Sequence, residues 1–243
     1  NVATASVTDY NAVVTVNGFF DLIDQVDEFV FLDMVQFQKQ SWQQRNRIIG
    51  PSGLEWLTVP VFIKGRFGQI ISNVEIKKSD FPTKQLRTIH QHYSRAPYFN
   101  QYWDELQNIF LRGQEFGFLG SLNIKLIQWL SGIFGLSANF KIASEMDVAN
   151  GRSLRLIDII TQLNCSEYVS PLGSAEYLKN DILLFEEAGI NLVFQNYEPV
   201  TYCQQYCEFT PFASALDLLF NKGPDAVALI RRGRSPDLQL NDI

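Results

Sequence analysis

The feature that most restricts the fold of this chain is a short apolar run with no polar interruption. The run Phe29-Val30-Phe31-Leu32 follows Glu28 directly. A strand with one wetted face alternates apolar and polar side chains, whereas a strand covered on both faces is apolar throughout. Strands covered on both faces are typical of parallel sheets, so the run predicts an α/β fold.

The remainder of the chain predicts the same alternation of strands and helices. Residues 2–16 predict one or two strands, and apolar spacing after Asn17-Gly18 predicts a short helix. Further strands are expected at 141–145, 167–170 and 190–194, and helices at 154–163, 174–187, 212–220 and 225–230. Strands that alternate with helices predict right-handed crossovers and a Rossmann-like, mostly parallel sheet.

Two segments depart from this rhythm. The turn Pro51-Ser52-Gly53 between residues 47–50 and 54–62 predicts an inserted β-hairpin. Pro60 restricts the second strand to the edge of a sheet, or marks the end of that strand. A helical insertion is expected over about residues 80–140. We therefore predict a single α/β domain over 1–230 and a loose, charged tail over 231–243.

Composition excludes several classes of protein. The net charge of −6 and the pI near 5.0 argue against a nucleic-acid partner. The most apolar window, 116–140, is interrupted by polar residues and glycines, which predicts no membrane span. Three cysteines and no signal peptide favour the cytoplasm. Cys203 and Cys207 have no further cysteine or histidine cluster nearby, so no metal site is predicted.

Polar and cationic side chains follow the apolar strand at the point where α/β sheets bind ligands. After Asp33 the chain contains no acidic residue until Glu55, whereas a simple solvated loop, the alternative reading, would mix both charges. Arg45 and Arg47 would project to one side of an extended strand and clamp a phosphate or carboxylate. The predicted substrate-binding residues are Gln36, Lys39, Trp42, Arg45, Arg47, Trp56, Lys64 and Arg66.

Three residues are candidates for catalysis: Asp33 or His90 as general base, and Asn46 as a hydrogen-bond donor. His90 lies beside the apolar stripe of a helix that ends near Pro97, so it is either a packing histidine or a base. His92 is expected to face solvent. Tyr202, Gln204 and Gln205 are candidates to close the pocket from the second half of the chain.

Several sequence phrases together resemble the WbqC-like family of bacterial proteins. They are GFFDLID at 18–24, FVFLDMVQFQKQSWQQRNRI at 29–48, GP and WLTVPV within 50–61, KGRFGQ at 64–69, APYF at 96–99, YVSPLGSAEYL at 168–178, AGINLVFQNY at 188–197 and LDLLFNKGP at 216–224. The resemblance implies a cytosolic enzyme of O-antigen or other surface-polysaccharide (lipopolysaccharide) biosynthesis that acts on sugar or nucleotide-sugar intermediates.

One segment departs from the family pattern. The family usually carries a Gln-Pro-x-Tyr-Leu-Pro-Trp loop before the Gly18 motif, whereas this chain has neither proline nor tryptophan over residues 9–16. Asp9, Tyr10 and Asn11 are the polar candidates to replace whatever that loop supplies.

Two hypotheses of function follow. The first is an acyl- or aminoacyltransferase that modifies the amino group of a nucleotide-linked amino sugar. It needs no bound cofactor, but it requires an acyl donor such as acyl-CoA or a carrier protein. The second is a nucleotidyltransferase-related or non-catalytic carrier or ligand-binding protein of polysaccharide assembly. The predicted partner in both is a nucleotide sugar or another anionic small molecule.

Overall fold

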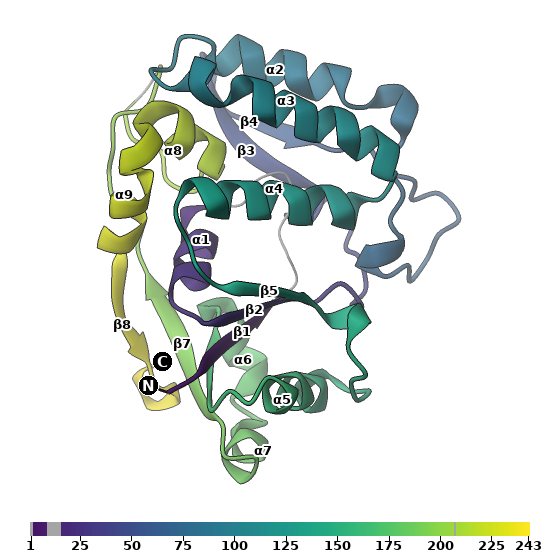
Figure 1. The fold of residues 1–243 in the computed structure, drawn as a ribbon, viewed down its shortest axis with the longest axis vertical. Helices are drawn as coiled ribbons and strands as arrows, with labels where there is room; N and C mark the ends of the chain where they lie inside the picture. Colours follow the sequence, from purple (N-terminus) through teal and green to yellow (C-terminus); the bar gives the residue numbers. More distant parts are fainter. Residues whose placement is uncertain (1, 9–15, 207) are drawn as a thin grey trace.

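A computed structural model describes residues 2–8, 16–206 and 208–243 and places a mostly parallel sheet at its centre (Figure 1). Within that part of the chain, six strands lie in the order β5-β2-β1-β6-β7-β8, and only β8 is antiparallel. The strands are β1 (Thr4–Thr8), β2 (Glu28–Phe31), β5 (Asn139–Ile142), β6 (Glu167–Ser170), β7 (Asn191–Tyr197) and β8 (Arg234–Leu238). The predicted Rossmann-like fold class is confirmed.

Sheets with this strand order bind ligands outside the carboxyl ends of their strands. Counted along the chain, the order is 3-2-1-4-5-6, the doubly wound order. Its direction reverses between β1 and β6, and sheets with this order commonly bind ligands beyond the carboxyl ends of the strands at that point. Asp9, Tyr10 and Asn11, which follow Thr8 in sequence, lie outside the described residues.

Helices cover both faces of the sheet, as the uninterrupted apolar strand predicts. In β2, Phe29 and Phe31 belong to one apolar cluster and Val30 to the other, because successive side chains point to opposite faces. The first cluster includes α1 (Asn17–Asp24), α4 (Leu119–Ile133), α8 (Ala215–Lys222) and α9 (Ala226–Arg232). The second includes α5 (Arg152–Gln162), α6 (Ala175–Leu178) and α7 (Ile182–Glu187).

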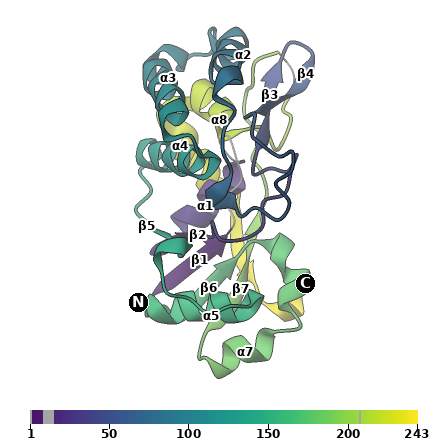
Figure 2. The same cartoon turned by 90° about the vertical axis from the view of Figure 1, so that its right-hand side faces the viewer.

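The hairpin and the helical segment are inserted between β2 and β5. After β2 the chain forms β3 (Arg45–Gly50) and β4 (Gly53–Thr58), then α2 (Thr83–Tyr93) and α3 (Phe99–Phe116), and returns through α4. Gly50 pairs with Gly53, so Pro51 and Ser52 make the predicted turn. Figure 2 shows α8 between the hairpin and α3, and both neighbours contact it.

The segment expected to form one helix over 174–187 is divided into α6 and α7. Asp181 lies at the break, where its backbone N–H donates to the carbonyl of Leu178. Its carboxylate accepts a 2.5 Å hydrogen bond from the Ser153 hydroxyl of α5. A short polar side chain that finds a partner outside the helix favours a turn, and this explains the interruption.

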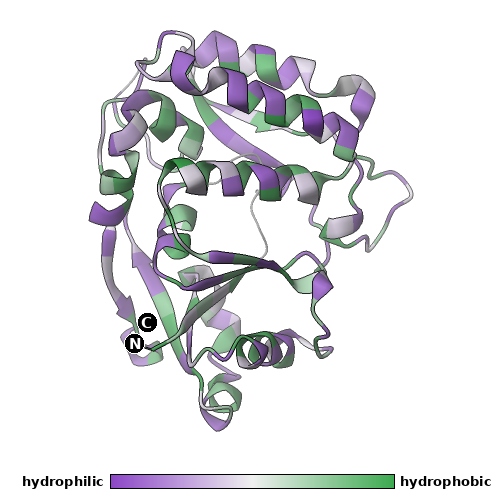
Figure 3. Cartoon of the chain, in the orientation of Figure 1, coloured by the Kyte–Doolittle hydropathy of each residue, from purple (hydrophilic) through white to green (hydrophobic). Residues whose placement is uncertain are grey.

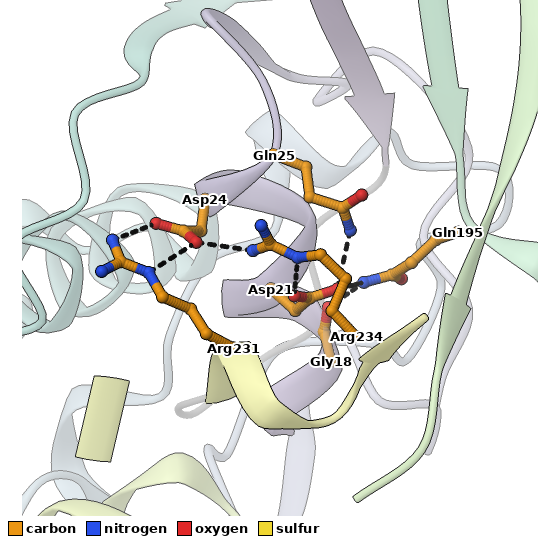
Figure 4. Close-up of polar contacts among 7 residues, drawn as sticks. All are labelled: Gly18, Asp21, Asp24, Gln25, Gln195, Arg231 and Arg234. Carbon is orange, nitrogen blue, oxygen red and sulfur yellow. Dashed lines mark hydrogen bonds and ion pairs between the residues drawn. The ribbon is translucent and has the colours of Figure 1, made fainter. Parts of the chain in front are cut away.

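The expectation of a loose tail after Arg231 is wrong. Residues 234–238 form β8, which pairs with β7 in the registers Phe194–Leu238 and Tyr197–Arg234. Arg231 and Arg234 bind two carboxylates of α1, Asp21 and Asp24, at the side of the sheet (Figure 4). We call these four residues the Asp–Arg cluster. Its ion pairs join α1 to residues more than 200 positions later in the sequence, and they therefore hold the tail against the remainder of the fold.

Every charge of the Asp–Arg cluster has a partner. Arg234 donates at 2.7 Å to Asp21 and at 2.5 Å to Asp24, and Arg231 donates to Asp24 at 2.7 and 2.9 Å. Burial raises the pKa of Asp21 despite donors from Gln195 and Arg234. Burial also acts to raise the pKa of Asp24, but hydrogen bonds from the two arginines outweigh it and hold that pKa below its ordinary value.

Hydrophilic residues alternate with hydrophobic ones along α2 and α3, at the top of Figure 3. Among the described residues, no helix is both long enough and apolar enough to cross a membrane.

Candidate functional site

Two arginines and two tryptophans gather on one side of the hairpin. Arg47 pairs with Trp56 across the hairpin, and Arg45 pairs with Thr58. The side chains of Arg45, Arg47 and Trp56 therefore belong to one face of the hairpin. The Arg45 guanidinium carbon lies 4.1 Å from the Trp56 ring centroid, and that of Arg47 lies 5.1 Å from the Trp42 centroid. The two indoles are 5.4 Å apart. We call Trp42, Arg45, Arg47 and Trp56 the Arg–Trp cluster.

Within the described part of the chain, the charges of the Arg–Trp cluster lack an acidic partner. Among the described residues, neither Arg45 nor Arg47 forms an ion pair, and the Nε atom of each is buried without a hydrogen-bond acceptor. Both side chains are half-buried, and a cation that has lost part of its water is ordinarily paired, because desolvation without compensation is costly. Stacking on an indole compensates only in part, typically about 0.5–2 kcal/mol. The cluster is therefore equipped to receive an anion.

Backbone contacts hold the strand that carries these arginines. The carbonyl of Arg47 accepts a 2.7 Å hydrogen bond from the N–H of Ser214, and the N–H of Ile49 donates to the Tyr93 hydroxyl at 2.9 Å. Ser214 caps α8, and Tyr93 ends α2. The two guanidinium groups therefore project from a strand braced by two helices.

The amides of Gln43 and Gln44, just before the strand, are buried and act as braces. The Oε1 atoms of Gln43 and Gln44 accept from the backbone of Gln38 and Gln40, and Gln44 Nε2 donates to the Val59 carbonyl. Asn123 of α4 donates to the Gln43 carbonyl at 3.0 Å. These bonds order the turn in which Trp42 lies.

A buried carboxylate behind the hairpin was not anticipated from the sequence. Asp217 of α8 is fully buried and accepts from the Tyr202 hydroxyl at 2.7 Å and from Gln204 Nε2 at 3.0 Å. Burial raises its pKa, although donors from Tyr202, Gln204, Tyr93 and Asn221 oppose the rise. The signal that could have revealed it is an aspartate inside the apolar run Leu216–Phe220.

Tyr93 connects this carboxylate to the Arg–Trp cluster, because it also binds the backbone of β3. Burial, followed by the charge of Asp217, raises the pKa of both Tyr93 and Tyr202 well above the ordinary value. Both phenols therefore stay protonated as donors. Tyr202 and Gln204, expected to close a pocket, instead satisfy Asp217.

Asp33 lies at the carboxyl end of β2 and is almost fully buried. Its carboxylate accepts hydrogen bonds from the N–H of Ser144 at 2.9 Å and from the Ser144 hydroxyl at 2.6 Å. Ser144 follows β5, so Asp33 ties together the ends of two neighbouring parallel strands. Its predicted role as a base stays a prediction.

The two histidines have exchanged the places expected for them. His92 is buried, its Nδ1 lies 2.7 Å from the Thr88 carbonyl, and its Nε2 lies 3.3 Å from Glu55 of β4. His90 is exposed and packs edge-to-face on Phe99 and Trp103. The hairpin covers the side of α2 next to His92, and a helical stripe read from hydrophobicity alone did not reveal that.

Asn46 is fully buried on the face of β3 opposite the arginines, and its Oδ1 accepts from the N–H of Arg47. Gln36 and Lys39 are exposed in the segment before the hairpin. Lys64 is exposed on the loop after it, whereas Arg66 pairs with Glu75 at 3.0 Å. The structure thus gathers Trp42, Arg45, Arg47 and Trp56 and neutralises Arg66 elsewhere.

Comparison with known proteins identifies relatives across most of the chain. The model of the WbqC-like protein family matches residues 16–229. A protein of Mycobacterium tuberculosis described as "Uncharacterized protein Rv1507c" is 36% identical over 215 residues, which cover 88% of this chain and 92% of that protein. No solved structure matches. The matched range includes the Arg–Trp cluster and Asp217.

Proposed function

The chain belongs to the WbqC-like protein family, and from that premise we propose that it is a cytoplasmic transferase of surface-polysaccharide (O-antigen) biosynthesis. Its substrate is a nucleotide-linked amino sugar, and the reaction transfers an acyl or aminoacyl group to the sugar amine. The observation that carries the proposal is the Arg–Trp cluster, in which two guanidinium groups have no acidic partner among the described residues.

The cluster matches the two parts of a nucleotide sugar that proteins recognise most readily. Guanidinium groups bind phosphate oxygens through parallel hydrogen bonds, and the diphosphate offers several such oxygens. The half-exposed ring of Trp56 offers a face on which a base or a sugar ring can stack. A diphosphate between Arg45 and Arg47 would accept hydrogen bonds from the N–H groups of two half-buried guanidinium groups that form no ion pair among the described residues.

The transfer step forms a C–N bond between the sugar amine and the acyl carbon. The C–S bond of a thioester, or the C–O bond of an acyl phosphate, breaks as the amine loses its proton to a base. Asp33 and His90 are the predicted bases, and Asn46 is the predicted donor to the oxyanion. Asn46 shares strand β3 with the arginines but lies on its buried face, so it acts only if the ligand reaches that face.

Binding is tested by the thermal shift of the purified protein with a panel of UDP- and dTDP-sugars. We expect at least one amino-sugar nucleotide to raise Tm, and Arg45→Ala to abolish that rise. Arg112→Ala, on the exposed side of α3, is the matched control and should keep it. If no nucleotide sugar in the panel stabilises the wild-type protein, the proposal fails.

The role of Asp33 is separable from binding. If Asp33 is the general base, Asp33→Asn should lower kcat about 10²–10⁴-fold and leave stabilisation by the ligand unchanged. If Asp33 is only a brace, the same change should lower Tm because the Ser144 contacts are lost, and kcat of the folded fraction should stay near wild type. Measuring both quantities on one preparation distinguishes the two roles.

The strand order favours one alternative, a nucleotidyltransferase-related activity, because doubly wound sheets commonly bind nucleotides at the switch point. That activity would join a nucleoside triphosphate to a sugar phosphate and release pyrophosphate. A pyrophosphate-release assay with nucleoside triphosphates and sugar phosphates tests it, and release that depends on both substrates would replace the transferase proposal.

A further inference from the structure

The loop after the hairpin exposes an unusual set of apolar side chains. Phe67 is 100% exposed, and Phe62 and Ile63 are more than 40% exposed. Phe116 and Phe118, from the junction of α3 and α4, are exposed to a similar extent. We call these five residues the Phe67 surface. Residues 62–67 lie on the loop that projects beyond the end of α3 in Figure 1.

Backbone pairing brings the two parts of the Phe67 surface together. Val61 pairs with Ile76, and Glu75 pairs with Phe118, so the loop lies against the α3–α4 junction. Phe62, Phe116 and Phe118 line a groove of about 490 Å³ together with Lys78. Three of the exposed rings therefore line one groove, and Ile63 and Phe67 follow Phe62 on the same loop.

The loop is held by polar contacts that leave its apolar side chains outside. The N–H of Arg66 donates to the Ile63 carbonyl, and Gln69 Nε2 donates to the Phe62 carbonyl. Gly65 and Gly68 flank the tip with φ of 75° and 69°, values that residues with a side chain rarely adopt. These hydrogen bonds and the two glycine conformations therefore stabilise the loop in the form that exposes Phe67.

Cations surround the Phe67 surface in a protein whose net charge is −6. Lys64 and Lys78 are exposed, and the Lys77 ammonium lies 5.9 Å from the Phe62 ring. Two acids of the described residues lie nearby. Glu75 is neutralised by Arg66, whose hydrogen bond lowers the Glu75 pKa, and Glu115 is exposed at the end of α3. Among the residues whose side chains are described, lysines therefore exceed unpaired acids around this surface.

We propose that the Phe67 surface docks the protein on an anionic lipid bilayer, with Phe67, Phe62 and Ile63 in the interfacial region and the lysines among the headgroups. Aromatic rings at a loop tip with a basic rim match the two attractions that hold peripheral proteins, apolar burial and attraction to negative lipids. The opposite charge of lipid and rim identifies the partner, because the remainder of the protein is acidic. This inference does not depend on the proposed transferase activity.

The test is co-sedimentation of the full chain with vesicles of phosphatidylglycerol mixed with phosphatidylcholine, compared with vesicles of phosphatidylcholine alone. We expect binding to the anionic vesicles that weakens as salt is added. Phe67→Ser should weaken the partition coefficient about tenfold, because one fully exposed ring no longer enters the interface. Lys78→Gln should weaken it about fivefold, as expected for one charge near the surface.

Matched controls lie on the opposite side of the sheet. Leu183→Ser removes an apolar side chain that is 65% exposed on α7, and Lys179→Gln removes an exposed charge before that helix. Both should bind vesicles as the wild type does. Equal sedimentation with neutral and anionic vesicles, or an effect of Leu183→Ser as large as that of Phe67→Ser, overturns the proposal. A concentration-dependent dimer that Phe67→Ser disperses, without lipid binding, would assign the surface to a second copy of the chain instead.

Discussion

Two pairs of arginines in this molecule have opposite surroundings. Arg231 and Arg234 contact the carboxylates of Asp21 and Asp24 in the Asp–Arg cluster. Arg45 and Arg47 stack on Trp56 and Trp42, with no acidic partner among the described residues. The first pair is neutralised inside the protein, whereas the second keeps its charge available.

The difference separates a structural role from a binding role. A carboxylate already bound to a guanidinium satisfies it, so an external anion would have to displace that carboxylate. An indole satisfies only the face of the guanidinium and leaves its in-plane donors for a planar acceptor such as phosphate. Arg45 and Arg47 lose hydration where they lie beside two tryptophans. The binding of an anion therefore offsets this desolvation cost.

Removal of the most central paired arginine should have the largest effect on stability. Arg234→Ala leaves Asp21 fully buried and without its cation, and we expect a loss of about 2–4 kcal/mol in the free energy of unfolding. Urea denaturation at neutral pH measures this loss. Arg232→Ala, an exposed neighbour, is the control. A loss no larger than that of the control would remove the structural half of the comparison.

The unpaired arginines should show the reverse behaviour. Arg47→Ala should change the free energy of unfolding by less than about 1 kcal/mol, yet weaken the binding of a stabilising nucleotide sugar about 10–100-fold, as expected for a charged hydrogen bond. Arg47→Lys should restore only part of the affinity, because an ammonium lacks the planar pair of donors. Isothermal titration calorimetry measures the affinities, and equal binding by wild type and Arg47→Ala would break the comparison.

Asp217 offers an intermediate case, a buried carboxylate with several donors but, within the described ranges, no cation. Its pKa is raised in the folded state, so the proton is held more tightly there than in the unfolded chain. Its contribution to stability is therefore complete below the ordinary aspartate pKa and is lost as the pH rises through the folded-state pKa. Asp217→Asn should flatten this part of the profile of Tm against pH. An unchanged slope would show that Asp217 binds its proton equally tightly in the folded and unfolded states.

The smallest effect is expected at the exposed end of the Asp–Arg cluster. The Arg231 side chain is 53% exposed, and Asp24 retains Arg234 when Arg231 is removed. Arg231→Ala should therefore cost only about 0.2–1 kcal/mol, and added salt should reduce that difference further. Urea denaturation at two salt concentrations tests this. A cost as large as that of Arg234→Ala would mean that the two ion pairs act as one unit.

Part of the candidate site follows from the sequence. The two-residue period of a strand predicts that Arg45 and Arg47 share a face, and the Pro51-Ser52 turn places Trp56 opposite Arg47. The neutralisation of Arg66 does not follow, because Glu75 lies nine positions away in a segment without regular periodicity. The burial of His92 likewise depends on Glu55 of the hairpin, which no pattern within α2 reports.

The sequence by itself determined most of the local elements, the mostly parallel sheet and the concentration of cations after β2, because these depend on the periodicity and charge of neighbouring residues. Only the tertiary structure decided which charges are neutralised. Arg234 binds Asp21, which lies 213 positions away in the sequence, and Asp217 accepts hydrogen bonds from side chains of other segments. Arg45 and Arg47 instead stack on tryptophans. The physical reason is that the electrostatic state of a side chain depends on partners brought together by folding, and those partners leave no local trace in the chain.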